Sequence, residues 1–285
     1  MVANLDKNDR ISLLKRGLAM SINRDQTNNI IRADWHNSLG IELANRGWLE
    51  EAAKEFSNAI ENVPDCSDTY DNIASVYSDN GELLKALDAY VQALRIDPNN
   101  AYVLHNLGCF LSNNGNELAA RCFTDASLLD SDLYESNFNL GLCFASEEHH
   151  EKAILQFEKA LEKNSCDLEV RLHLALSLMA LDKFVKAIKE LRIITSQDEQ
   201  NEEAWFNLGL CYNQQGFLEE AQKAFSKAMY INPNRIEILL SCASLLMRRG
   251  EVKEAKKLIK QSKLLDLKNT IDFMDQDEYL FKLSK

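Results

Sequence analysis

The chain has 285 residues, of which 46% are apolar and 27% charged, and its formal net charge is −12 at pH 7. This charge disfavours general nucleic-acid binding, which depends on neutralising phosphates with Lys and Arg. No run of about 20 apolar residues occurs, so no transmembrane segment is expected. The polar N-terminus contains no recognisable signal peptide, and we expect a cytoplasmic protein.

Seven cysteines are present, and none falls in a Cys-x-x-Cys pair. Reduced thiols in a cytosolic protein explain this pattern best. A metal site would need clustered ligands at defined spacing, and none is found. The pair His149 and His150 lies between two expected helices and is interpreted as solvated. We therefore expect neither a metal nor a cofactor.

Residues 1–32 do not share the pattern of the rest of the chain. Apolar residues recur there every three or four positions and predict a helix from about Asp9 to Ile22. The residues of this stripe are Ile11, Leu14, Leu18 and Ile22. Two interpretations remain open: a helix that caps the repeats that follow, or a detachable segment that folds into a groove.

From residue 33 to residue 269, one pattern of small and apolar residues returns about every 34 residues. Such a period indicates stacked helical hairpins, none of which can bury its apolar face alone. The third repeat lacks one residue after Gly115, which predicts a tighter turn, and Glu148 stands where other repeats have glycine. The repeats are 33–66, 67–100, 101–133, 134–167, 168–201, 202–235 and 236–269.

Repeat 202–235 shows the pattern most clearly. We expect one helix over about 202–215 and a second over about 218–231, separated by Gly216 and ended by Pro233. Small residues should let the two helices approach, and large residues should fill the remaining space. The patterned residues are Trp205, Leu208, Gly209, Tyr212, Ala221, Phe225 and Ala228.

This alternation resembles the tetratricopeptide repeat family, whose signature is W-x2-L-G-x2-Y, then A-x3-F-x2-A, then P. Repeat 202–235 matches all eight places, whereas 168–201 and 236–269 match fewer. The resemblance implies an all-α fold, an α-solenoid: a right-handed superhelix of seven hairpins with N- and C-terminal capping helices. Residues 270–285 would form the C-terminal cap. The first helix of each hairpin would line the concave groove.

In the first helix of each hairpin, the position before the Leu-Gly pair holds an asparagine in four of the seven repeats and a histidine in repeat 168–201. A column of amides can pair with the backbone of an extended peptide, because each amide donates and accepts. Similar asparagine ladders hold peptides in O-GlcNAc transferase and kinesin light chain. The alternative is that asparagine is simply common at this position in the family. These residues are Asn72, Asn106, Asn139, His173 and Asn207.

The neighbouring groove positions are polar in the early repeats and apolar in the later ones. An exposed apolar patch of several hundred Å² usually marks a binding site, so the later repeats are expected to hold an apolar or amphipathic segment. The C-terminal tail filling this strip itself is the alternative. The apolar groove residues are Phe138, Leu142, Leu172, Leu176, Phe206, Leu210 and Leu240.

Charged residues restrict the partner. Co-chaperones of this family clamp a C-terminal carboxylate with Lys and Arg, but the corresponding positions here hold amides and acids such as Asp34 and Asn37. The run 248–268 is rich in lysine. It is read as a solvated helix face, or as a docking patch for an acidic partner, an anionic membrane surface or the acidic middle of another copy.

No phosphate loop, nucleophile motif or second domain accompanies the repeats, so an enzyme is not expected. The sequence favours a protein–protein interaction scaffold or assembly factor that binds a partner peptide or helix in its groove. An adaptor, or a chaperone for secretion or complex assembly that binds an unfolded or amphipathic client segment, is the alternative.

Overall fold

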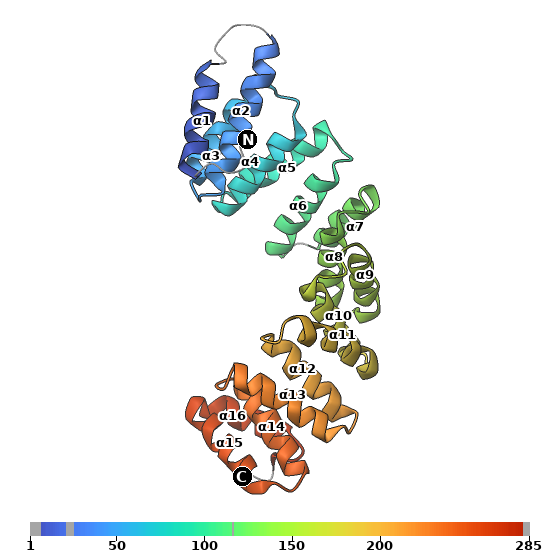
Figure 1. Cartoon of the computed structure of the whole chain (residues 1–285). Coiled ribbons are helices and arrows are strands. Elements are labelled where there is room, and N and C mark those ends of the chain that lie inside the picture. Colours follow the sequence, from blue (N-terminus) through green and yellow to red (C-terminus); the bar gives the residue numbers. More distant parts are fainter. Residues whose placement is uncertain (1–6, 21–25, 116, 282–285) are drawn as a thin grey trace. The chain divides into compact units, whose positions relative to one another are not determined.

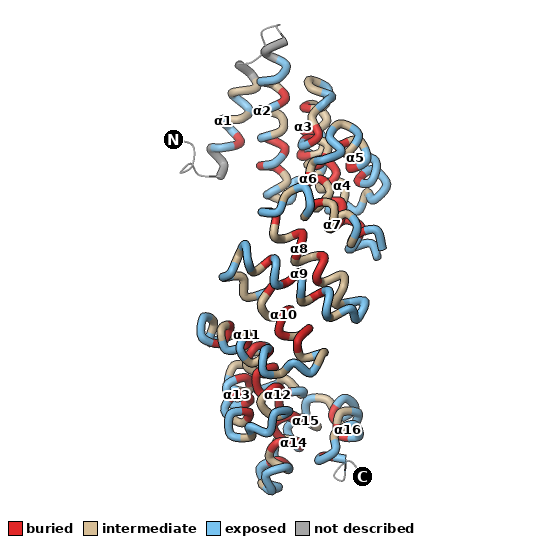
Figure 2. Tube along the Cα trace, turned by 90° about the vertical axis from the view of Figure 1, so that its right-hand side faces the viewer, coloured by how far each residue is buried: buried red, intermediate tan, exposed pale blue. Residues whose placement is uncertain are grey.

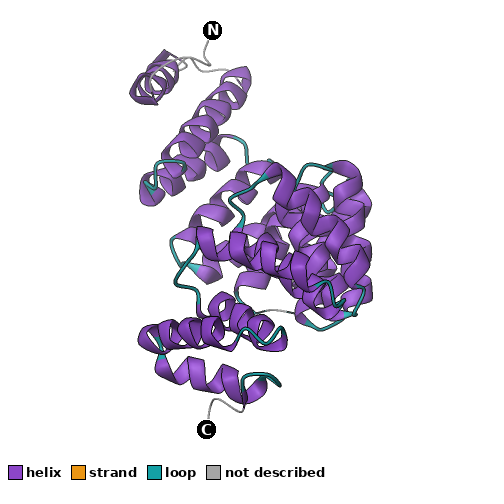
Figure 3. Cartoon of the chain, turned by 60° about the horizontal axis from the view of Figure 1, so that its bottom comes forward, coloured by secondary structure: helices purple, strands orange, loops and turns teal. Residues whose placement is uncertain are grey.

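In the computed structural model, residues 7–20, 26–115 and 117–281 are described, and every regular element among them is a helix (Figures 1 and 3). The chain divides into two compact units, residues 1–140 and 141–285. The boundary falls inside α8, and each unit is considered by itself. Successive helices pair into hairpins within each unit, which confirms the expected α-solenoid.

The N-terminal unit contains α1 and three helical hairpins, in which α2 packs on α3, α4 on α5, and α6 on α7. Its helices are α1 (Lys7–Met20), α2 (Gln26–Ala44), α3 (Leu49–Asn62), α4 (Ser67–Asp79), α5 (Leu83–Ile96), α6 (Ala101–Asn113), α7 (Ala119–Leu129) and the first part of α8 (Tyr134–Ser146).

The C-terminal unit continues the same alternation and ends on a single short helix that packs on the last hairpin. Its remaining helices are α9 (His150–Lys163), α10 (Leu168–Ala180), α11 (Phe184–Gln197), α12 (Glu202–Gln214), α13 (Leu218–Ile231), α14 (Ile236–Arg248), α15 (Val252–Leu265) and α16 (Leu267–Gln276). Figure 2 shows that in both units buried residues alternate with exposed ones along each helix, as amphipathic helices require.

The two helices of a hairpin meet where a small residue of the first faces a large residue of the second. A Cβ atom at Gly209 would lie 2.5 Å from Cδ1 of the Phe225 ring, and three other hairpins show the same overlap. Phe225 is wholly buried. In α10 and α11 the small residue is Ala175 and the large one is Leu191, both wholly buried. The glycine is therefore needed because the aromatic ring occupies the space of its side chain.

Each hairpin turns through one residue with a positive φ angle, which favours glycine. The residues are Gly47, Gly81, Gly115, Glu148, Asp182, Gly216 and Gly250. They follow one another at 34 residues, except for one interval of 33. In the turns other than that at Gly115, the N–H of the next residue closes the turn; for example, the N–H of Phe217 donates to the Tyr212 carbonyl at 2.9 Å.

The expectation of a tighter turn in repeat 101–133 is wrong. Residues 114–118 separate α6 from α7, whereas only residues 80–82 separate α4 from α5. Helix α7 has 11 residues and α5 has 14. The missing residue is taken from the first turn of α7, because Phe123 must keep its place against Gly108.

Helices cover both ends of the repeats. Helix α1 packs on α2, and a Cβ at Gly17 would lie 2.6 Å from the Trp35 ring. The expected end of this helix, Ile22, lies outside the described residues. Helix α2 begins at Gln26, ahead of the expected repeat boundary. Helix α16 begins at Leu267 and packs on α14 and α15 with Met274 wholly buried.

We predict that Gly209→Ala lowers the free energy of unfolding of the C-terminal unit by about 1–3 kcal/mol, because the added Cβ overpacks the Phe225 contact. This exceeds the ~1 kcal/mol by which alanine is favoured in a helix. Adding Phe225→Leu should recover most of the loss, because Ala175 and Leu191 already pack in this way. Urea denaturation of both single variants and the double variant measures the coupling; additive effects would contradict the contact.

We predict that Glu148→Gly and Asp182→Gly each stabilise the C-terminal unit by up to about 1 kcal/mol. A left-handed conformation costs an L-residue about 1–2 kcal/mol, which glycine does not pay. The larger backbone entropy that glycine loses on folding offsets part of this gain. Amide hydrogen exchange of the flanking helices measures the change. Glu147→Gly, next to Glu148 but without a positive φ angle, is the control and should not stabilise.

Candidate functional site

The predicted groove residues all lie on the first helices of hairpins, in two separately described sets. Asn72 on α4, Asn106 on α6, and Phe138 and Asn139 on α8 belong to the N-terminal unit. All four are partly buried. The other eight belong to the C-terminal unit: Leu142, Leu172, His173, Leu176, Phe206, Asn207, Leu210 and Leu240.

In the N-terminal unit, the amides join successive repeats. The Nδ2 of Asn72 donates to Asn37 Oδ1 at 3.1 Å, and the Nδ2 of Asn139 donates to Cys109 Sγ at 3.5 Å. The Nδ2 of Asn106 donates to Asp71 Oδ2 at 2.7 Å. Each amide nitrogen is thus directed at the preceding repeat, so this column contributes to stacking as well as to any ligand surface.

Asp71 is the charged group at the centre of this polar face. Only 9% of its surface is exposed, and its Oδ1 is buried without a hydrogen-bond donor among the described residues. Burial, the largest cause, raises the pKa of Asp71 to about 6; the hydrogen bond from Asn106 opposes this rise, and the charge of Asp68 adds to it. At neutral pH the carboxylate is therefore ionised, with one of its two oxygens accepting a hydrogen bond and the other accepting none from the described residues.

Apart from Asp68, the polar groups described near Asp71 are uncharged. The Ser75 hydroxyl lies 3.3 Å from the Tyr90 hydroxyl, and burial raises the pKa of Tyr90 to about 12, so this phenol stays protonated. One repeat later, His105 Nδ1 lies 2.9 Å from Ser136 Oγ, and burial lowers the pKa of His105. His105 is therefore neutral at pH 7, and none of these groups compensates the carboxylate.

In the C-terminal unit, four leucines keep partly exposed side chains: Leu142 on α8, Leu172 and Leu176 on α10, and Leu210 on α12. His173 is also partly buried and packs beside Phe157, with ring centroids 6.0 Å apart. Burial lowers the pKa of His173, which favours the neutral ring. These side chains are partly exposed, although Leu210 also packs against the core cluster that contains Phe206 and Phe225.

Phe206 and Leu240 do not line an exposed strip, so that expectation is wrong for them; Asn207, expected in the column of amides, is buried as well. Phe206 is 8% exposed and packs with Phe225 in the core formed by α12, α13 and α14. Asn207 is 6% exposed, and its Nδ2 donates to the Glu203 carbonyl at 3.0 Å. Leu240 is wholly buried in a cluster with Met274 and Leu280, so the C-terminal segment covers it, as the alternative interpretation proposed.

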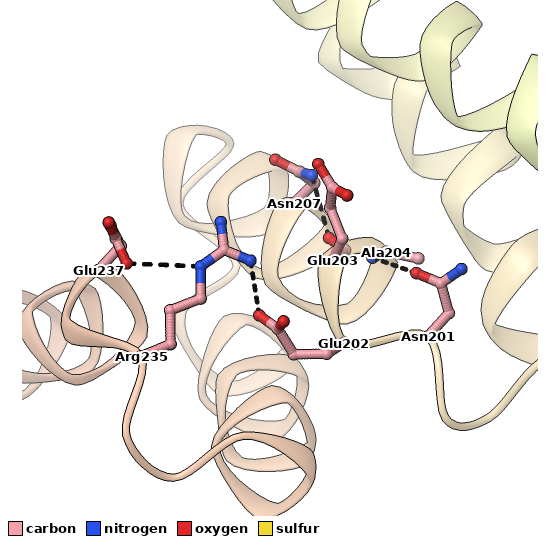
Figure 4. A network of polar contacts seen from close by, with 7 residues as sticks. All are labelled: Asn201, Glu202, Glu203, Ala204, Asn207, Arg235 and Glu237. Atoms are coloured by element: carbon pink, nitrogen blue, oxygen red, sulfur yellow. Dashed lines mark hydrogen bonds and ion pairs between the residues drawn. The ribbon is translucent and has the colours of Figure 1, made fainter. Parts of the chain in front are cut away.

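The sequence did not reveal the polar network that holds this region together (Figure 4). Arg235, which precedes α14, pairs with Glu202 at 2.7 Å and with Glu237 at 3.4 Å. Its guanidinium lies 5.0 Å from the centroid of the Phe206 ring. Asn201 caps α12 by accepting from the Ala204 N–H at 2.9 Å. Arg235 thus fixes α14 on α12 and covers Phe206 at the same time.

A concavity of about 1170 Å³ lies among α11, α12 and α13, apart from the predicted groove residues. Its walls include Arg192 and Lys227 from the second helices of two hairpins, and Trp205 and Tyr212 from the first helix between them. Repeat packing accounts for Trp205 and Tyr212 in the sequence, so their pattern gave no sign of this concavity.

No group of three or more His, Cys, Asp or Glu side chains among the described residues has an arrangement that could hold a metal ion. None of the described helices combines the length and apolar character that crossing a membrane requires.

Parts of the chain are similar in sequence to curated proteins. The chain is 25% identical over 224 residues to the peroxisomal targeting signal receptor of Saccharomyces cerevisiae, which covers 75% of this chain and 36% of the receptor. It is 36% identical over 72 residues to the photosystem I assembly protein Ycf3 of Synechococcus, covering 24% of this chain and 42% of Ycf3. The chain therefore spans less than half the length of either relative.

Solved structures agree with the architecture. PilF of Pseudomonas aeruginosa superposes with a TM-score of 0.64 at 25% identity, covering 73% of this chain and 95% of PilF. Family models described as tetratricopeptide repeats match residues 134–163 and 202–235, and a model described as a TPR repeat matches residues 74–115. The hairpins that these models match carry the left-handed turn and the contact between a small residue and a large one. These three stretches of the chain are therefore tetratricopeptide repeats.

Proposed function

We propose that the chain is a non-catalytic interaction scaffold that holds a peptide segment or helix of a partner protein on the first helices of its hairpins. The partly exposed leucines Leu142, Leu172, Leu176 and Leu210 are the main support. Their packing within the chain leaves part of each side chain accessible, and apolar patches on protein surfaces commonly bind partners. Tetratricopeptide repeats are in general interaction modules rather than enzymes, which agrees with this proposal.

The second candidate is an adaptor or chaperone for complex assembly that binds an unfolded or amphipathic client segment. The likeness of one part of the chain to a photosystem assembly protein favours this reading. A scaffold binds folded partners through a defined segment, whereas a chaperone prefers clients before they fold. Comparing the capture of a folded and a freshly denatured form of the same partner separates the two. In either case we propose a cytoplasmic location.

We also propose that copies of the chain associate through opposite charges. Helix α15 presents Lys253, Lys256, Lys257 and Lys260 to solvent, and no described acidic side chain pairs with them. Acidic residues dominate the middle of the chain. Exposed charge pairs weaken as salt screens them, with a Debye length of about 8 Å at physiological ionic strength.

Self-association through α15 predicts that sedimentation velocity gives a smaller particle as salt rises from about 50 mM to 500 mM. The double variant Lys256→Glu/Lys260→Glu should sediment as the smaller species at both salt concentrations. A particle of constant size across the salt range would rule out this mode of association.

We predict that Leu172→Ser/Leu176→Ser removes most partner binding, because each buried leucine contributes about 1.5–3 kcal/mol on leaving water. Affinity capture followed by mass spectrometry compares the proteins retained by the variant and by the unmodified chain. Leu155→Ser, a matched change at a half-exposed position on the second helix α9, should retain the same partners. Far-UV circular dichroism confirms that both variants stay helical. Equal capture by the groove variant and the unmodified chain would refute the proposed site.

A further inference from the structure

The polar face of the N-terminal unit holds a negative charge that the fold does not neutralise. Asp71 lies on α4 with 9% of its surface exposed, and its Oδ1 receives no hydrogen bond from the described residues. Its other oxygen accepts from a neutral amide, Asn106 Nδ2, at 2.7 Å. An ionised carboxylate so enclosed costs free energy unless a cation or further donors compensate it.

Of the other helices packed on α4, α2 carries Arg32 and α3 carries Lys54, but among the described charges the one that acts on the pKa of Asp71 is that of Asp68. The two helices that form this face supply no cation either. Helix α4 contains Asp68, Asp71 and Asp79 but no Lys or Arg, and α6 contains no charged residue. The next helix, α5, contributes Lys85, which pairs with Glu82 and lies over the Tyr77 ring. The Asn106 amide donates to the Asp71 carboxylate and the Ser75 hydroxyl to the Asp71 main-chain carbonyl, and neither group carries a charge.

Compensation from a bound ligand is therefore the simplest reason for a carboxylate at this place. We propose that Asp71 receives the side chain of a lysine or arginine in a partner segment bound along α4 and α6. This inference rests on the proposed function, since it names a residue type that a partner segment bound on the first helices would carry. It concerns the N-terminal unit alone, whereas the leucine surface belongs to the C-terminal unit.

The local geometry suits a basic side chain. The χ2 torsion of an aspartate is broad and nearly two-fold, so the carboxylate can turn its unpaired oxygen towards a ligand at low cost. The nitrogen ends of Asn72 and Asn106 are directed at the preceding repeat. Since Asn106 Nδ2 lies 2.7 Å from the carboxylate, the Oδ1 of the same amide adds an acceptor close to it. Ammonium and guanidinium groups are donors only, so they match this set of oxygens, whereas an acidic segment would be repelled.

Selection from a peptide display library tests the proposal on the full chain. A library of random 12-residue peptides is panned against the unmodified protein, against Asp71→Asn and against Asp88→Asn. Asp88 is a matched control, because it is an exposed aspartate on α5 of the same unit with no described interaction. Removing either charge changes the net charge equally, so general attraction of basic peptides to this acidic chain affects both variants alike.

We expect the unmodified protein and Asp88→Asn to select peptides with a lysine or arginine at one fixed position, and Asp71→Asn to lose this preference. For a selected peptide, Asp71→Asn should weaken binding about tenfold, as should replacement of its basic residue by glutamine. Together the two changes should weaken binding little more than either alone. Fluorescence anisotropy with labelled peptide gives the three affinities.

The Asp71→Asn protein should remain folded, because the Asn106 amide can still donate to an oxygen at this position. Its melting temperature at pH 7.5 should exceed that of the unmodified protein, because no charge is then buried. Since the folded carboxyl has a raised pKa, of about 6, the buried charge is lost as pH falls below that value. The two melting temperatures should therefore converge towards pH 4.5.

The outcomes separate this inference from the proposed function. Selected peptides without a basic preference, or a preference that survives in Asp71→Asn, would overturn the inference and leave the scaffold function standing. If the unmodified protein selects no peptide and captures no partner, both are wrong. Loss of the preference in Asp71→Asn alone, with a melting temperature at least as high as normal, establishes the contact.

Discussion

The contact between a small residue on one helix and a large ring on the next determines the rest of this structure. Where the ring of Phe225 occupies the space that a side chain at Gly209 would need, the two helices can lie close enough to enclose an apolar seam. Because the contact recurs with the period of the sequence, every hairpin presents equivalent faces to its neighbours. The residues left over from packing, such as Asn72, Asp71 and Leu172, are then the ones that can contact something else.

Those remaining residues are not independent of stability. In the N-terminal unit, Asn72 and Asn106 direct their amide nitrogens at the preceding repeat, so the same column that could recognise a ligand also joins repeats. In the C-terminal unit, Arg235 takes an equivalent part by linking Glu202 and Glu237 above the Phe206 ring. A surface built in this way is held in a fixed shape before a partner arrives, which lowers the entropy lost on binding.

Much of the fold could be predicted from the sequence, because spacing records which face of a helix is apolar and where a turn must fall. Spacing does not record how far a neighbouring helix covers that face. Phe206 and Leu240 were therefore expected at the surface but are buried, one by the packing of α13 and α14 and the other by the C-terminal segment. Glu148 was recognised by its place in the repeat, whereas the left-handed Asp182 was missed. The division of the chain into two units near residue 140 could not be predicted, because the repeat pattern continues without interruption through α8.

The turns at Glu148 and Asp182 have a consequence for motion. Both hold an L-residue in a backbone conformation that suits glycine, so the hairpins α8/α9 and α10/α11 are less firmly closed than those that turn on glycine. Local opening draws on such weaker segments first, and it occurs without unfolding of the remainder. The partly exposed Leu142, Leu172 and Leu176 lie on these same hairpins. We therefore expect local opening to occur first in the hairpins that carry these leucines. Such opening would let the surface accommodate partner side chains of different shape through small rearrangements.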